Sequence, residues 1–356
     1  MQELACLSYH ESMKLLVVVE DWISFYVQAE ALVKGLRQLG VECRTVTIKE
    51  AKADEKVFRE EAWRAVLGVG SWYGWEYLVQ RPMHYGLQVV PWLVSNGGVN
   101  KPEVVKLLNG LKGWFTPSKF CRLKFSQSGL VSQKIEVIPE AVDDELWRPL
   151  PSGEIENFAN QLSVTDGQTP ILLTMGGDAT SKGAQEVLRA LGRLKPDLPW
   201  MYIIKTWPQE HTFKRGLEEF KIITKLNLRE RVRYIMGEFS KEFIVGLINM
   251  CDIYVAPSRG EGFGLPFVQA GMCGKPVISI DALSIKEIVV PEKTGFLVKS
   301  RNVGGEVRAD INDLGDKLER LIRDKELRNV MGRQGMEWCR ANFSPRIIAQ
   351  QFLEKL

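Results

Sequence analysis

Residues 257–266 read Pro-Ser-Arg-Gly-Glu-Gly-Phe-Gly-Leu-Pro, and this stretch decides the fold that we expect. The apolar run 253–256 before it is typical of a buried strand, and residues 267–273 after it are typical of a helix. A glycine-rich turn that carries an acid therefore lies between the carboxyl end of a strand and the first turn of a helix. In an open α/β sheet ligands bind at that position, because glycines let them approach the backbone and helix N–H groups attract anions.

The composition is that of an ordinary globular protein with more than one domain. The chain has 356 residues, 45% hydrophobic and 26% charged, and a single core seldom grows that large. A net charge of +3 does not indicate nucleic-acid binding. Six cysteines without metal-binding spacing indicate reduced thiols of a cytosolic protein, and three distant histidines predict no metal site. No apolar run reaches the roughly 18 residues of a membrane span, and residues 1–12 lack the order of a signal peptide.

Apolar runs alternate with helical patterns along both halves of the chain. The first half begins with the strand-like run 14–19 and a helical pattern over 25–39, and the second begins with the run 171–175. This alternation predicts two Rossmann-like α/β domains, each a doubly wound parallel sheet. Two such domains would face a central cleft between their strand ends.

Prolines and polar residues around 149–153 predict the linker between the domains. We therefore expect a first domain at residues 1–150, a second at 151–340, and a C-terminal helix at 341–356 that packs back on the first domain. Residues 72–84 are interpreted as an aromatic-rich helix, and 314–340 as a charged helical stretch.

Two loops of the second half carry candidate chemistry. Lys182 follows the glycine-rich loop after the run 171–175 and stands beside a helix start, where an ammonium and backbone N–H groups would hold a diphosphate. Glu261 would accept hydrogen bonds from sugar hydroxyls, and the Gln269 amide would bond a ribose diol. The plainer interpretation of Lys182 and Gln269 is that both are solvated helix residues.

Together these features resemble the GT-B glycosyltransferases, specifically the family 4-like retaining group. Residues 134–143, KIEVIPEAVD, are similar to that family's KI-VIPNGVD junction. Residues 252–258, 261–266 and 273–278 (DIYVAPS, EGFGLP and CGKPVI) follow its signature almost letter by letter, and 294–298, TGFLV, resembles its TG-LV turn. The resemblance covers most of the chain and is stronger in the second half.

The resemblance implies a GT-B fold in which the second domain binds a nucleotide-sugar donor and the first binds the acceptor. Lys182 matches the lysine that contacts the donor diphosphate, and Glu261 matches the first acid of an E-x7-E motif beside the transferred sugar. These two are the expected catalytic residues. The implied donor-binding residues are Gly176, Gly177, Lys205, Glu261, Gly262, Phe263, Gly264, Leu265 and Gln269.

The sequence departs from the family pattern on the donor side. Gln269 replaces the second acid, and a neutral amide makes a weaker bond to ribose than a carboxylate does. Gly177 stands where the family usually has a phosphate-binding arginine, which removes a bidentate donor. Lys205, at the end of the next strand, is the candidate replacement.

The acceptor side rests on fewer residues. The family's histidine after the strand 87–94 is missing, and residues 21–24 replace its glycine pair after the first strand. The many aromatic residues of this half suit stacking on sugars or lipid headgroups as well as core packing. The basic residues of 119–124 suit a solvated face, or a peripheral contact with the inner face of a membrane. The acceptor-side residues that we expect are Trp22, Ser24 and Asn96.

Two interpretations of the function remain open. In the first, the protein is a cytoplasmic, hexosyltransferase-like enzyme that moves a sugar with retention from a nucleotide-diphosphate sugar to a glycan, lipid-linked or small-molecule acceptor. As the resemblance implies, it would need neither metal nor cofactor. In the second, it binds a nucleotide or sugar as the weak or inactive partner of another transferase. A sugar-nucleotide epimerase of the same fold is a third class, which the few histidines disfavour.

Overall fold

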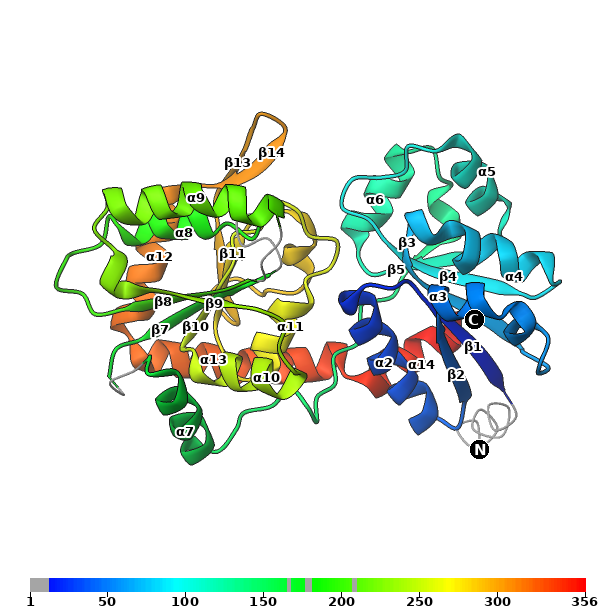
Figure 1. Cartoon of the computed structure of the whole chain (residues 1–356), viewed down its shortest axis with the longest axis horizontal. Helices are drawn as coiled ribbons and strands as arrows, with labels where there is room; N and C mark the ends of the chain where they lie inside the picture. Colours follow the sequence, from blue (N-terminus) through cyan, green and yellow to red (C-terminus); the bar gives the residue numbers. More distant parts are fainter. Residues whose placement is uncertain (1–12, 165–167, 177–180, 207–209) are drawn as a thin grey trace. The chain divides into compact units, whose positions relative to one another are not determined.

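The structure is a computed structural model, and it describes residues 13–164, 168–176, 181–206 and 210–356, with 210–217 described by their backbone only. Contacts divide the chain into two compact units. The first comprises the residues up to Asp143 together with Ala341–Leu356, and the second is Asp144–Arg340. Each unit is built on a parallel six-stranded sheet covered by helices (Figure 1).

The sheet of the first unit has the order β2-β1-β3-β4-β5-β6, and its described pairs are all parallel. β1 has the bounds predicted from its apolar run, because consecutive buried residues suit a strand covered on both faces. The strands are β1 (Lys14–Val19), β2 (Glu42–Thr47), β3 (Ala65–Ser71), β4 (Val89–Val94), β5 (Trp114–Thr116) and β6 (Ile135–Val137).

Helices cover both faces of this sheet. One face packs against α2 and α14, and the other against α5, α6 and the π-helical turn η3. α2 and α14 pack closely, since a Cβ on Gly35 would lie 2.0 Å from the carbonyl oxygen of Pro345. The helical elements are α2 (Ile23–Gln38), α3 (Ile48–Ala53), η1 (Glu55–Phe58), η2 (Trp72–Gly74), η3 (Glu76–Gln80), α4 (Arg81–His84), α5 (Pro102–Gly110), α6 (Lys119–Gln127), η4 (Ser132–Lys134) and α14 (Pro345–Lys355).

The sheet of the second unit has the order β12-β11-β10-β7-β8-β9, again with parallel pairs. A two-stranded antiparallel hairpin, β13–β14, extends from this unit (Figure 1). Its turn residues Gly304 and Gly305 both have positive φ, 60° and 86°, as a tight hairpin turn requires. The strands are β7 (Ile171–Met175), β8 (Met201–Thr206), β9 (Val232–Met236), β10 (Ile253–Val255), β11 (Val277–Ile280), β12 (Gly295–Val298), β13 (Ser300–Val303) and β14 (Glu306–Ala309).

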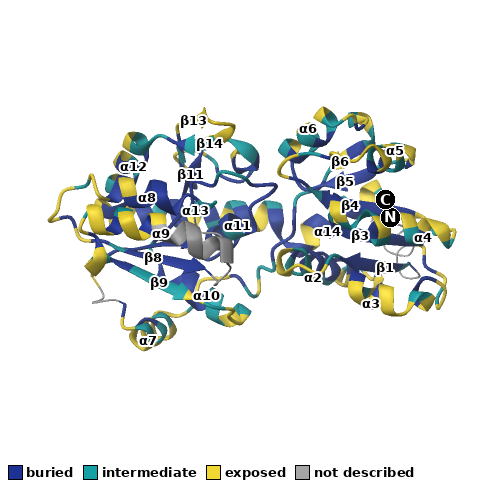
Figure 2. Cartoon of the chain, turned by 45° about the horizontal axis from the view of Figure 1, so that its top comes forward, coloured by how far each residue is buried: buried dark blue, intermediate teal, exposed yellow. Residues whose placement is uncertain are grey.

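The strands of both sheets are buried and the outer faces of the helices are exposed, as Figure 2 shows. In the second unit α8 packs against α12, and both contribute to the core over β7, β8 and β10–β12. The helical elements are α7 (Ser152–Leu162), α8 (Ala184–Leu191), α9 (Glu210–Lys225), η5 (Arg229–Arg231), α10 (Lys241–Met250), α11 (Leu265–Met272), η6 (Leu283–Glu287), α12 (Ile311–Arg323) and α13 (Lys325–Phe343), the last of which runs across the unit boundary.

The structure differs from the expected elements in three places. The expected linker leads directly into α7, whose Phe158 stacks edge-on against Phe243 and so belongs to the second unit. The aromatic stretch 72–84 is not one helix but a 3₁₀ turn, a π turn and a short α-helix. The charged stretch 314–340 is divided at Asp324, where α12 ends, and the Asp324 carboxylate accepts a hydrogen bond from the Leu327 N–H at 2.8 Å as α13 begins.

Candidate functional site

The candidate site lies where the strand order of the second sheet reverses. From β7 the chain proceeds to β8 and β9 on one side and then returns to β10 on the other side of β7. The loops that follow β7 and β10 therefore leave the carboxyl edge of the sheet side by side. Such a reversal is where ligands bind in doubly wound sheets. The β7–α8 loop carries Lys182, and the β10–α11 loop carries Glu261.

The β10–α11 turn is buried, and the Ser284 side chain fixes its backbone. Glu261 and Phe263 are both buried, and the buried Ser284 hydroxyl lies 3.0 Å from the Glu261 carbonyl oxygen and 2.7 Å from that of Phe263. Gly264 is the N-cap of α11 with φ 116°, and a Cβ there would lie 2.7 Å from the Phe267 ring. This position therefore requires glycine, which places Leu265 at the start of the helix.

The two loops pack directly on each other. The Arg259 N–H donates to the Ser181 carbonyl at 2.9 Å. Gly183, the N-cap of α8, has φ 82°, and a Cβ there would lie 2.4 Å from the carbonyl oxygen of Pro257. A Cβ on Gly176 would lie 2.7 Å from Cγ of Lys182, so the Lys182 side chain can pass here only because residue 176 has no side chain.

Lys182 and Glu261 form an ion pair. The Nζ of Lys182 lies 2.7 Å from Oε2 and 3.1 Å from Oε1 of Glu261, and the two side chains are 21% and 7% exposed. The two residues named as catalytic from the sequence are thus in contact, although 79 positions separate them. A pair so little exposed is stable only while both charges are present.

Lys205 is the last residue but one of β8 and pairs with Met175 of β7. Its carbonyl accepts a hydrogen bond from the Gly176 N–H at 3.2 Å, and its Nζ lies 5.8 Å from the centre of the Phe239 ring. Burial lowers the pKa of the Lys205 ammonium, and the charge of Glu238 opposes that shift. Gln269 is buried on α11 rather than exposed. Gly177 lies outside the described residues.

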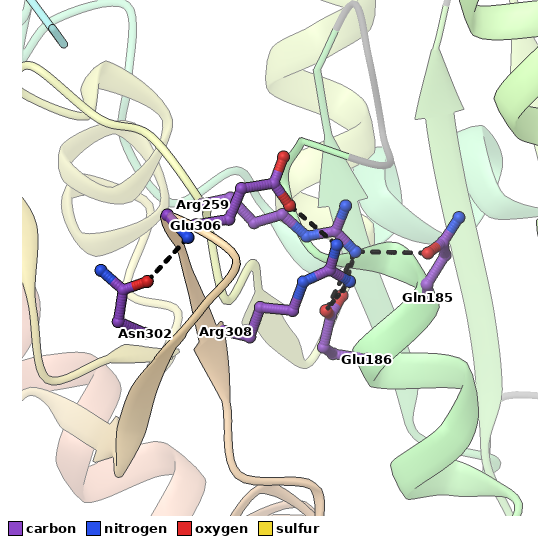
Figure 3. Close-up of polar contacts among 7 residues, drawn as sticks. Gln185, Glu186, Arg259, Asn302, Glu306 and Arg308 are labelled. Atoms are coloured by element: carbon purple, nitrogen blue, oxygen red, sulfur yellow. Dashed lines mark hydrogen bonds and ion pairs between the residues drawn. The ribbon is translucent and has the colours of Figure 1, made fainter.

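Three charged side chains around α8 form a cluster that the sequence did not reveal (Figure 3). The Nη2 atom of Arg259 lies 2.9 Å from each carboxylate oxygen of Glu186 and 3.2 Å from the side-chain oxygen Oε1 of Gln185. Arg308 of β14 reaches the same carboxylate at 3.3 Å. Glu186 therefore joins the Glu261 loop to α8 and to the hairpin. Nothing in the spacing of α8 marks Glu186 as buried, so only the structure identifies it.

The three expected acceptor-side residues do not form one group. Trp22 is the N-cap of α2 and is 62% exposed, and Ser24 is exposed in the first turn of that helix. Asn96 is exposed in the loop after β4, which β3 separates from β1 in the sheet. Trp22 instead lines a pocket with Tyr73, which follows β3, and neither Ser24 nor Asn96 lines it.

Across the described ranges there is no group of three or more His, Cys, Asp or Glu side chains placed to hold a metal ion. Within the same residues no helix combines the length and apolarity that crossing a membrane requires. The described cysteines are free and buried: Cys43, Cys121, Cys251, Cys273 and Cys339.

Comparison with known proteins places the second unit in a family. Residues 156–338, just over half of the chain, match the family model described as glycosyl transferases group 1. An uncharacterized glycosyltransferase of Methanocaldococcus jannaschii is 33% identical over 241 residues, which cover 67% of this chain and 61% of that protein. The chain thus matches less than two thirds of this relative's length.

Solved structures resemble the chain over nearly its whole length. A glycosyltransferase from Rickettsia africae has a TM-score of 0.78 at 17% identity, with 96% of this chain and 97% of that chain covered. Anabaena HepE in complex with UDP-glucose has a TM-score of 0.76 at 18% identity, with 96% and 99% covered. Together with the two doubly wound units, this likeness shows the GT-B fold.

Proposed function

The chain belongs to the glycosyl transferases group 1 family, and on that premise we propose that it transfers a sugar from a nucleotide-diphosphate sugar to an acceptor. The observation that carries the proposal is the Lys182–Glu261 ion pair at the strand-order reversal of the second unit. A structural neighbour, HepE, was solved with UDP-glucose, which supports a donor of that class. The second unit is the proposed donor domain and the first the proposed acceptor domain.

The geometry suits stabilisation of a departing diphosphate. Lys182 supplies an ammonium, α8 begins two residues after it, and α11 begins four residues after Glu261. Both have glycine N-caps, Gly183 and Gly264, so no N-cap side chain accepts from their first N–H groups. These N–H groups and the ammonium are the donors that a diphosphate needs as negative charge develops on it.

Glu261 has a second role in this proposal. Before the donor binds, its carboxylate neutralises Lys182. A donor phosphate competes for the ammonium, and the released carboxylate accepts hydrogen bonds from hydroxyls of the transferred sugar. We propose the remaining donor contacts at Gly176, Gly177, Lys205, Gly262, Phe263, Gly264, Leu265 and Gln269.

We further propose that transfer retains the anomeric configuration, needs no metal ion and takes place in the cytoplasm. Attack on the face that the diphosphate leaves gives retention, and Lys182 supplies positive charge at the leaving group. The free, buried cysteines are consistent with a reducing compartment. Proton NMR of the first-formed product reports its anomer, and turnover after exhaustive chelation tests the metal. An inverted product or complete loss of turnover with the chelator would contradict these two points.

The experiment for the activity is a donor panel with the purified full chain. UDP- and GDP-sugars are incubated with glycan, lipid-linked and small-molecule acceptors, and the released nucleoside diphosphate is measured. Glu261→Gln and Lys182→Met are each expected to lower the transfer rate by about 100-fold or more. Lys286→Met, which alters an exposed lysine of the same unit, is the control and should retain the rate. Full transfer by purified Glu261→Gln would exclude this assignment.

A second candidate function is a nucleotide- or sugar-binding partner of another transferase. It is favoured by Gln269 and Gly177, which replace two charged donor contacts of the family pattern. Donors that raise the unfolding temperature, with neither hydrolysis nor transfer from any of them, would support this candidate. Turnover with any donor would exclude it.

A further inference from the structure

The first unit has its own strand-order reversal, and a pocket lies there. From β1 the chain passes to β2 on one side and then to β3 on the other side of β1. The loops after β1 and β3 leave the sheet at this reversal, which is the usual ligand position in such sheets. Together with α3 they line an open pocket of about 260 Å³. That volume is just below the roughly 300–1,000 Å³ of sites for drug-sized molecules, so it suits one sugar ring.

Two aromatic rings of this pocket are exposed, those of Trp22 and Tyr73, and Tyr73 stacks on Trp72 through one face only, which leaves its other face for a ligand. Trp22 is 62% exposed and Tyr73 is 69% exposed, whereas Trp72 and Trp92 of the same unit are buried. Exposed Trp and Tyr rings offer rigid apolar faces with a polar edge, which suits the C–H face of a sugar ring. A third ring, that of Tyr77, is partly covered by the Lys52 ammonium 5.1 Å from its centre.

The polar groups of the pocket are held in place by the backbone. Glu20 accepts hydrogen bonds from the Ser71 N–H at 2.5 Å and the Ser71 hydroxyl at 2.8 Å, which joins the loop after β1 to the end of β3. A Cβ on Gly70 would lie 2.6 Å from Oε2 of Glu20, so glycine makes room for this carboxyl. Asp21 accepts from the Lys49 N–H at 3.1 Å. Oε2 of Glu20 already accepts two hydrogen bonds, whereas Oε1 of Glu20 and both oxygens of Asp21 each keep a lone pair for a ligand hydroxyl.

The charges that line the pocket favour a ligand without negative charge. Three carboxyl groups, those of Glu20, Asp21 and Glu76, line it against the single ammonium of Lys52. Such a lining attracts hydroxyl donors and repels phosphates, sugar acids and anionic lipid headgroups.

We propose that this pocket is the acceptor site and that it binds an uncharged sugar ring, stacked on Trp22 and Tyr73 and hydrogen-bonded to the carboxylates of Glu20 and Asp21. The role of this sugar as an acceptor rests on the proposed transferase function. The binding of the sugar in the pocket does not, because binding requires no turnover. Neither Ser24 nor Asn96 has a part in it.

The test is fluorine NMR of the full chain labelled with 5-fluorotryptophan, with the Trp22 signal assigned from Trp22→Phe. The probes are the methyl glycosides of glucose, galactose and mannose, N-acetylglucosamine, and glucose 6-phosphate. A neutral sugar is expected to shift the Trp22 signal at millimolar concentration, and glucose 6-phosphate to require at least about ten times more. Absence of a shift with every neutral sugar, or tighter binding of the phosphate, would overturn the proposal.

Matched variants locate the binding. Tyr73→Ala is expected to weaken the binding of the neutral sugar about tenfold, which corresponds to about 1.4 kcal/mol for one aromatic face. Phe220→Ala removes an exposed ring of the second unit and should leave the affinity unchanged. Both substitutions are at exposed positions, and the unfolding temperature verifies that the variants fold. Equal affinity in Tyr73→Ala and the unsubstituted chain would refute stacking.

Three further outcomes separate this proposal from its alternatives. If vesicles with anionic phosphatidylglycerol bind the chain and Trp22→Ala abolishes that binding, the pocket rim is a membrane contact and the proposal is wrong. If sugars shift the Trp22 signal while the donor panel gives no transfer, the sugar site stands and the proposed activity fails. If transfer occurs without any shift, the activity stands and this pocket is not the acceptor site.

Discussion

The ion pair between Lys182 and Glu261 gives the sharpest test of the candidate site. Its closest atoms are 2.7 Å apart, and its side chains are 21% and 7% exposed. At an effective dielectric constant of about 20, unit charges at that distance attract by about 6 kcal/mol, and most of this offsets the desolvation of both groups. Lys182→Met leaves a buried carboxylate without a counter-charge, and we expect it to lower the unfolding free energy of the second unit by about 3 kcal/mol.

Differential scanning calorimetry of the full chain measures this effect. For a unit of this size 1 kcal/mol shifts the transition by about 2–4 °C, so Lys182→Met should lower it by about 6–12 °C. The double variant Lys182→Met/Glu261→Gln leaves neither charge and should recover most of the loss, with a coupling energy above about 2 kcal/mol. Lys286→Met is the control, because the Lys286–Asp281 pair is more than half exposed on the lysine side and should contribute under about 1 kcal/mol. Additive effects of the two single substitutions, within about 0.5 kcal/mol, would refute the reasoning.

The same variants predict opposite effects on nucleotide binding. Glu261→Gln frees the Lys182 ammonium, so nucleoside diphosphate should bind more tightly by about fivefold, or about 1 kcal/mol. Lys182→Met removes the ammonium and should weaken binding. Isothermal titration with UDP and GDP measures both effects. Weaker binding in both variants would show that Glu261 does not compete with phosphate for the lysine.

Local backbone geometry predicts the effect of one further substitution, and the burial of titratable side chains predicts two further effects. Gly183→Ala combines a positive φ with a clash against the Pro257 carbonyl, so it should destabilise the second unit by at least about 2 kcal/mol in calorimetry. Gly260→Ala is the control, because a Cβ there meets nothing within 4 Å. Equal losses of stability in the two variants would contradict this account. Burial raises the pKa of four described cysteine thiols to about 12 and raises that of Cys121 as well. At pH 8 a thiol reagent should therefore leave these five cysteines unmodified in the native chain and modify them after denaturation, and rapid native modification of any of the five would contradict their burial. Burial also raises the pKa of Glu20, so its stabilising contribution is full below its unfolded pKa near 4.5 and is lost as the pH rises through its folded pKa. In denaturant unfolding the stability of the unsubstituted chain relative to Glu20→Gln should therefore fall as the pH rises above about 4.5, and a constant difference would contradict the pKa shift.

Much of the fold was predictable because parallel strands covered on both faces are continuous apolar runs. The run KLLVVV is β1 and the run ILLTM is β7, both with the predicted bounds. The helical pattern predicted over 25–39 stops before Gly40, whose φ of 85° is that of a glycine just past a helix end. These assignments depend on local burial and on glycine geometry, which a sequence carries directly.

The errors arose where tertiary contacts override local signals. Residues 149–153 were expected to be irregular, but Gly153 is the second residue of α7, which Phe158 packs against α10. Asp324 between α12 and α13 is a helix-capping residue type, so the break was visible in principle without any glycine or proline.

The candidate site was predictable only in part. Two loops after parallel strands indicated a shared edge, but only the strand order shows that β7 and β10 are neighbours and that Lys182 meets Glu261. Glu186 illustrates what sequence cannot provide, since a charged helix residue is ordinarily exposed and its two arginine partners lie 73 and 122 positions away.

The return of α14 to the first unit has a consequence for synthesis on the ribosome. α14 supplies Ile348, Ala349 and Phe352 to one face of the first sheet, yet the ribosome adds it only after the whole of the second unit. The second unit is one continuous segment, whereas the first is divided around it. During translation the unit whose synthesis begins first is therefore completed last, and the part of its sheet face that α14 covers stays exposed beside α2 until the end of synthesis.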